Sequence, residues 1–179
     1  MAEQAIPQEQ PRRRPPGHAP GRRGADWMFG GVYGTVLASA LLAALQNKSD
    51  PYTPYYDAAW VLVTAAAAGL AHGYSHHMAT HRRGSAGHRW RQLVLALFDE
   101  WPLVVAALPT VLLLLASGLW DWSEPSTTAL GLGLNTALLF AWGAFVALRL
   151  GYGLGSAVLI GIADAAIGVA IVAANAVIK

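Results

Sequence analysis

The sequence predicts an all-α fold: a bundle of five transmembrane helices with the N-terminus inside and the C-terminus outside. Of the 179 residues, 55% are hydrophobic and only 12% are charged, which is about half the charged fraction of an ordinary soluble domain. Five apolar segments are close in length to the roughly 20 residues that a helix needs to cross a bilayer. These segments are residues 27–45, 57–80, 101–118, 129–148 and 154–178.

The basic residues set the predicted orientation. Of the 12 Lys and Arg residues, ten fall before the first segment, between the second and third, or between the fourth and fifth. Only Lys48 and Lys179 fall on the other side. Because cytoplasmic loops carry the excess of Lys and Arg, the N-terminus is expected inside, and the chain is expected to be a multi-pass protein of the plasma membrane.

Residues 1–26 have no apolar run and contain five prolines and five arginines. Such a segment cannot bury enough apolar surface to fold, so we expect a disordered, basic cytoplasmic tail. Basic residues near a membrane attract anionic lipids by about 1 kcal/mol each. The arginines expected to anchor this face are Arg12, Arg13, Arg14, Arg22, Arg23, Arg82, Arg83, Arg89 and Arg91. No folded module supports a nucleic-acid partner.

A helix start is predicted at the third segment, where Asp99 and Glu100 precede Pro102, because an acidic cap and an early proline suit a first turn. Residues 89–98 are therefore expected to form an interfacial helix or the foot of this span. Glycines predict close helix packing. Gly30 and Gly34 form a G-x-x-x-G pair, and Gly161, Asp164 and Gly168 share a helix face; we expect these pairs to pack within the bundle rather than form a dimer seam.

Polar residues inside the predicted spans form the candidate site. His72 and His76 are spaced i, i+4 and share a helix face. Asp164 lies at about the same depth in the fifth span, and an unpaired aspartate at mid-membrane costs at least about 2.5–3.5 kcal/mol. His72 is therefore its first expected partner and Arg149 its second. Asp99, Glu100 and Tyr74, with Thr110 and Asn135, are expected to extend a polar line.

Three functions remain open for this cluster. His72, His76, Asp164, Asp99, Glu100 and Tyr74 suit a proton or cation pathway, because His and Asp chains in membranes mark such routes. A non-catalytic structural or accessory subunit of a membrane complex would use the same groups only to join helices. A divalent metal could be held by His72, His76 and Asp164 as two imidazoles and a carboxylate.

No enzymatic activity and no cofactor other than that metal are expected. The chain has no cysteine, which excludes thiol catalysis and Fe–S clusters. Five short helices leave little room for an internal pore, so a homo-oligomer is the expected state. The lipid bilayer is the other expected partner.

The sequence also resembles uncharacterised small multi-pass integral membrane proteins of actinobacteria, which have no assigned activity. The resemblance lies in the string Ala71-His72-Gly73-Tyr74-Ser75-His76, the helix start Asp99-Glu100-Trp101-Pro102, and the Ala- and Gly-rich closing span. It implies a bacterial plasma membrane. It implies no substrate and no mapped site.

Overall fold

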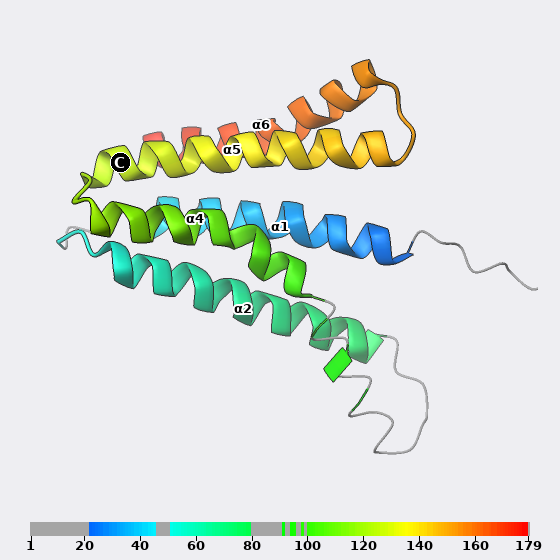
Figure 1. The fold of residues 1–179 in the computed structure, drawn as a ribbon, viewed down its shortest axis with the longest axis horizontal. Helices are drawn as coiled ribbons and strands as arrows, with labels where there is room; N and C mark the ends of the chain where they lie inside the picture. Colours follow the sequence, from blue (N-terminus) through cyan, green and yellow to red (C-terminus); the bar gives the residue numbers. More distant parts are fainter. Residues whose placement is uncertain are drawn as a thin grey trace, which may run out of the picture.

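The computed structural model describes residues 22–45, 51–79 and 100–178, together with residues 91, 94, 95 and 98. Over these residues the fold is all-helical, as predicted. The helices are α1 (Arg22–Leu45), α2 (Pro54–Ala79), α4 (Trp101–Leu119), α5 (Glu124–Arg149) and α6 (Leu154–Ile178). Each successive helix reverses direction, so α1, α4 and α6 run one way while α2 and α5 run the other (Figure 1).

The five helices form three layers (Figure 1). Helices α5 and α6 pair along one side, α1 and α4 form the middle, and α2 lies against α4 on the far side. Helix α1 is central, because it contacts each of the other four described helices. Helices α4 and α5, although consecutive, touch each other only slightly.

The helices match the predicted segments closely, and the differences lie at their ends. Helix α6 has the predicted bounds, and α4 ends one residue beyond the prediction. Helix α5 begins at Glu124, because Ser123 and Pro125 start the helix before its apolar residues begin. Helix α1 begins at Arg22, inside the stretch predicted as tail. Residues 1–21, and most of the predicted interfacial segment 89–98, lie outside the described part of the chain.

Close helix packing depends on the glycines, as predicted. Gly34 lies against the backbone of Leu103, and Gly30 lies beside Pro102, so α1 and α4 approach at their backbones. Gly161 lies against Phe140, and Gly168 lies against Thr136, which brings α6 onto α5 in the same way. Both glycine pairs therefore serve packing within the bundle. The Gly-rich string after α5 is a turn, in which Gly151 adopts φ 83° that only glycine accepts without strain.

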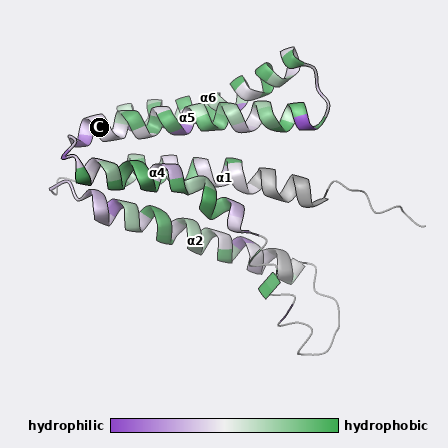
Figure 2. Ribbon diagram, in the orientation of Figure 1, coloured by the Kyte–Doolittle hydropathy of each residue, from purple (hydrophilic) through white to green (hydrophobic). Residues whose placement is uncertain are grey.

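The core is a cluster of Ala, Val and Leu side chains shared by α1, α2, α4 and α5. Its members include Ala38, Leu42, Val61, Leu103 and Leu114. Many large apolar side chains remain outside it, including those on the outer faces of α4 and α6, and Figure 2 shows hydrophobic residues along whole helices.

Three described helices are long and apolar enough to cross a membrane: Trp101–Leu119, Glu124–Arg149 and Leu154–Ile178. The apolar part of α1, Gly30–Leu45, is shorter. Helix α2 carries two tyrosines and an aspartate near its start and histidines near its end, which lower its mean hydropathy.

Candidate functional site

The predicted polar residues separate into three places in the bundle. The first is at the end of α2, where His72 Nε2 lies 3.8 Å from Glu100 Oε1. His72 is 38% exposed and Glu100 is 16% exposed. The distance suits an ion pair but is too long for a hydrogen bond. Glu100 directly precedes α4, so this contact joins the end of α2 to the start of α4.

The second place is Asp164, about halfway along α6. Its carboxylate lies against Gly143 of α5, where a Cβ atom would collide with it. Half-buried at that position, it makes no hydrogen bond and no ion pair with any residue that the structure describes. The missing side chain at Gly143 is what allows the carboxyl group into the α5–α6 contact.

The structure does not bring Asp164 to His72. The sequence predicted similar depths for the two residues, but the middle layer of α1 and α4 separates α2 from α6 (Figure 1). The predicted pairing of Asp164 with His72 was based only on their estimated depth in the membrane, and depth does not determine which helices are neighbours. The second expected partner, Arg149, instead stacks its guanidinium on the Phe145 ring at 5.4 Å from the centroid.

Of the other residues predicted to belong to the His and Asp cluster, the structure describes the side chain of Tyr74. Tyr74 is 54% exposed. The His76 side chain and Asp99 lie outside the described part of the chain. Within that part, no three His, Asp or Glu side chains come together as metal ligands. With His72 and Asp164 in different layers, the expected metal set is not assembled.

The third place is at the centre of the bundle. Thr110 Oγ1 on α4 donates a hydrogen bond of 2.9 Å to Asn135 Oδ1 on α5, and both side chains are fully buried. Asn135 Nδ2 has no hydrogen-bond partner among the described residues. On α1, the buried Thr35 and Ser39 donate their hydroxyl hydrogens to carbonyl groups of their own helix, at 2.8 and 2.7 Å.

Apolar residues interrupt the predicted polar line along α4. Leu103, Ala106 and Ala107, all buried, lie between Glu100 and Thr110. Thr110 and Asn135 are thus joined to each other, as the sequence suggested, but no described polar side chain connects them to the His72–Glu100 contact.

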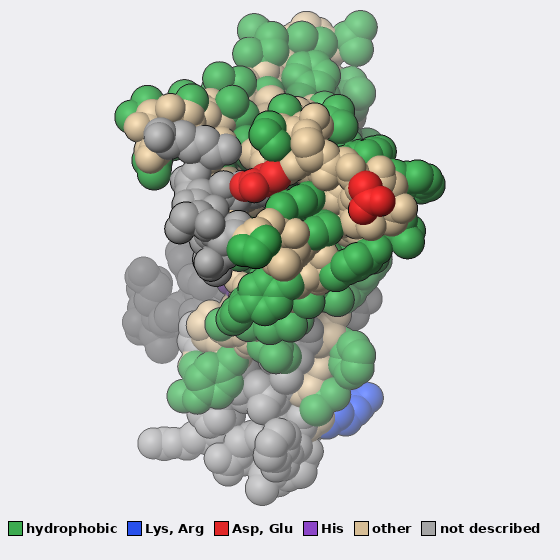
Figure 3. Space-filling model, turned by 90° about the vertical axis from the view of Figure 1, so that its left-hand side faces the viewer, with side chains coloured by type: hydrophobic (Ala, Val, Ile, Leu, Met, Phe, Trp, Pro, Cys, Tyr) green, Lys and Arg blue, Asp and Glu red, His purple; other side chains and the backbone are tan. Residues whose placement is uncertain are grey.

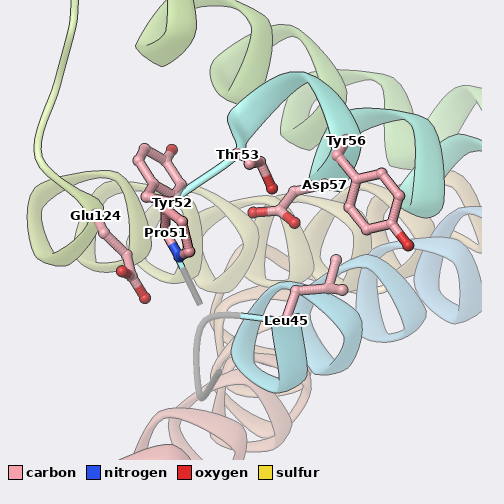
Figure 4. A pocket seen from close by; sticks show the side chains of 7 residues that line it. All are labelled: Leu45, Pro51, Tyr52, Thr53, Tyr56, Asp57 and Glu124. Carbon is pink, nitrogen blue, oxygen red and sulfur yellow. The ribbon is translucent and has the colours of Figure 1, made fainter. Parts of the chain in front are cut away.

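Sequence reasoning overlooked a fourth polar group, at the opposite end of the bundle. Asp57 is only 6% exposed, in the first turn of α2, where the helix dipole favours a carboxylate. With Tyr52, Thr53, Tyr56 and Glu124 it lines a cavity of about 70 Å³ (Figure 4). Figure 3 views this end, where acidic atoms lie among hydrophobic ones. The sequence did contain a signal for this position. Pro54 is a good first residue of a helix, and Asp57, three residues later, therefore falls in the first turn.

Neighbouring contacts hold this end together. Tyr52 Oη and Ser117 Oγ lie 2.6 Å apart and share a hydrogen bond between the start of α2 and the end of α4. Gly118 lies against the Tyr55 ring. The aromatic residues here suit the headgroup region of a membrane, where amphipathic rings are enriched.

Comparison with known proteins assigns no family or function to these polar groups. The chain matches no family model, no curated protein and no solved structure.

Proposed function

We propose that this chain is a five-span integral membrane protein with its N-terminus inside. At 1.5 Å per residue, α1 with 24 residues and α2 with 26 are about 36 and 39 Å long, more than the roughly 30 Å of bilayer hydrocarbon. The alternating directions of the five helices fit successive crossings (Figure 1). Arg149 lies at one end of α5 and Glu124 at the other, which fits the positive-inside rule.

The function that the geometry supports best is that of a non-catalytic subunit which assembles in the membrane, with copies of itself, through α6. The observation that carries this proposal is Asp164, a half-buried carboxyl group midway along an apolar helix, with no hydrogen-bonding or ionic partner among the described residues. A group of this kind in a bilayer needs a partner, water or a proton.

Helix α6 offers the surface for such assembly. It is at the edge of the bundle, and its buried residues are Ala157, Gly161 and Gly168, all on one stripe. Asp164 lies on the same stripe, three residues after Gly161, but its side chain remains partly exposed. Ile167, one turn further along this side of the helix, is also exposed. A second α6 packed there could share a hydrogen bond between two Asp164 side chains, one of them protonated. Polar side chains join membrane helices by about 0.6 kcal/mol each on average.

The test compares self-association of the purified full chain with that of two variants. Asp164→Asn keeps the hydrogen-bonding capacity, so the variant should remain oligomeric. Asp164→Leu removes that capacity, so the variant should dissociate at higher protein concentration, measured by light scattering in mild detergent. Ser156→Leu, which removes an exposed polar side chain near the start of α6, is the matched control and should behave like the wild type.

Cysteine cross-linking adds a geometric readout, because the chain has no cysteine of its own. Ile167→Cys, at an exposed position one turn from Asp164, should form a disulfide between copies, whereas Gly153→Cys in the α5–α6 turn should not. A wild-type chain that is monomeric at all concentrations would refute assembly through α6, and so would a Leu variant that associates as tightly as the wild type.

Proton or cation conduction is the second candidate, favoured by the same unpartnered carboxyl and by the buried Thr110–Asn135 pair. In this case Asp164 would carry the proton, and water or a neighbouring copy would complete the path that the apolar residues of α4 interrupt. The test is flux into liposomes for the wild type and Asp164→Asn. Flux that is lost in a variant that still assembles supports conduction; no flux from either protein between about pH 5 and pH 8, the range over which histidines titrate, rejects it.

A further inference from the structure

An apolar groove runs between α4 and α5 on the outside of the bundle. Its volume is about 460 Å³, and its lining is almost wholly apolar. Helices α4 and α5 contact each other only slightly, whereas α1 packs extensively against both, which leaves this groove between them. The residues that line it include Val105 and Pro109 on α4, and Leu138, Ala141, Trp142 and Phe145 on α5.

Trp142 forms one wall of the groove and is held in place from behind. Its indole lies against Gly31 of α1, where the ring atoms are about 3 Å from the position that a Cβ would take. Its edge meets the Phe145 ring at a centroid distance of 6.3 Å and an angle of 78°. The wall is therefore fixed by contacts within the protein and does not need a ligand to form.

A positive charge lies at the inner end of this groove. Trp142, Phe145 and Arg149 are spaced i, i+3 and i+7, so they lie along one face of α5. The Arg149 guanidinium stacks on the Phe145 ring. No carboxylate among the described residues forms an ion pair with it. An exposed cation thus lies directly beyond an apolar channel.

The dimensions match one leaflet of a bilayer. From Leu138 to Arg149 the helix rises by about 16 Å at 1.5 Å per residue, and half of a hydrocarbon core is about 15 Å. A lipid tail in the groove would thus place its headgroup at the level of Arg149. An uncharged headgroup would gain nothing from that cation, whereas a phospholipid with a net negative charge would.

We propose that the α4–α5 groove, with Arg149 at its end, is a binding site for one anionic phospholipid of the inner leaflet. The acyl chain lies along Trp142 and Ala141, and the phosphate group faces Arg149. This inference rests on the proposed insertion of the bundle in a bilayer, but it does not depend on assembly through Asp164.

The test uses the tryptophan in the wall as the reporter. The full chain is reconstituted in phosphatidylcholine vesicles that contain a rising fraction of phosphatidylglycerol brominated on its acyl chains. Bromine quenches nearby indoles, so the part of the quenching that is lost in Trp142→Phe reports on the groove. A parallel series with brominated phosphatidylcholine measures the occupancy by a zwitterionic lipid.

We expect quenching of Trp142 at lower fractions of phosphatidylglycerol than of phosphatidylcholine. Arg149→Gln should weaken this preference about fivefold, the factor that corresponds to about 1 kcal/mol for one basic residue. Arg91→Gln removes another exposed arginine expected to attract anionic lipids, but one that does not line the groove. This variant should therefore leave the preference measured at Trp142 unchanged. Ala141→Leu should fill the groove and remove the quenching, whereas Ala129→Leu, on an exposed part of α5 away from the groove, should not.

Two results would overturn the proposal. Equal quenching by the two lipids, insensitive to Arg149→Gln, would mean that the groove holds bulk lipid. A Trp142 that neither lipid quenches would mean that a protein surface or no lipid occupies it. The far-ultraviolet circular dichroism of each variant establishes that it has folded. Because dissociation of the oligomer in Asp164→Leu should leave the lipid preference intact, failure of this inference is distinguishable from failure of assembly through α6.

Discussion

Gly34 is the position at which a single methyl group should disturb the bundle most clearly. A Cβ at this position would lie 2.9 Å from the Ala106 Cβ and 3.1 Å from the Leu103 carbonyl carbon, and it would collide with the Leu103 carbonyl oxygen. Backbone atoms cannot rotate away as the end of a flexible side chain can. Gly34→Ala should therefore force α1 and α4 apart.

The magnitude follows from comparison with Gly133, which has no atom within 4 Å of its Cβ position. Both substitutions gain the helix propensity of alanine over glycine, up to about 1 kcal/mol. Only Gly34→Ala adds overpacking, which costs about 1–3 kcal/mol. Since the propensity gain is common to both, the two variants should differ in their free energy of unfolding by about 1–3 kcal/mol, with Gly133→Ala at or above the wild type.

The assay is thermal unfolding of the purified chain in one detergent, followed by tryptophan fluorescence. For a chain of this size 1 kcal/mol corresponds to a shift in Tm of about 2–4 °C, so the two variants should melt several degrees apart. If Gly34→Ala melts at or above the temperature of Gly133→Ala, the backbone contact between α1 and α4 is wrong.

Three further predictions concern the polar groups and the orientation. Thr110→Val should destabilise the protein by about 0.6 kcal/mol, measured by the same melting assay. If the double variant Thr110→Val, Asn135→Leu loses less stability than Thr110→Val alone, the two side chains are coupled. Glu100→Gln should change stability by at most about 1 kcal/mol, because the ion pair that it removes is partly exposed; a larger shift in Tm would contradict this. Ser126→Cys should react with a membrane-impermeant maleimide in intact cells and Gly153→Cys only after permeabilisation, and the reverse pattern would invert the topology.

Helix positions could be predicted from the sequence because each apolar run is long, and the glycine faces could be predicted because i, i+3 and i+4 spacing is local. Gly34 and Gly168 pack as expected for this reason. Helix ends were less predictable. Hydropathy marks where apolar residues stop, whereas α5 starts at Glu124, where the capping residues begin.

Neighbour relations were the part that the sequence could not supply. The expected pairing of His72 with Asp164 used equal depth, but five helices of similar apolarity can be arranged in many ways at one depth. Which helices touch depends on the shapes of their faces. Here the small face of α1 admits α4 and α5, and α1 and α4 therefore separate α2 from α6. Asp57 was overlooked because it opens a helix, where a carboxylate has an ordinary capping role.

The central position of α1 has a consequence for the order in which the protein forms. Helix α1 is synthesised before the other four described helices, yet its largest contacts are with α4 and α5, which leave the ribosome after α2. In the proposed membrane insertion, the buried face of α1, with Thr35 and Ser39, would remain in lipid or in the insertion machinery until then. Both hydroxyl groups donate hydrogen bonds to carbonyl groups of α1 itself. Neither hydroxyl donor therefore needs a partner on another helix before the bundle forms. The α1–α2 hairpin shares few contacts of its own, and completion of the fold therefore depends on the later arrival of the C-terminal helices.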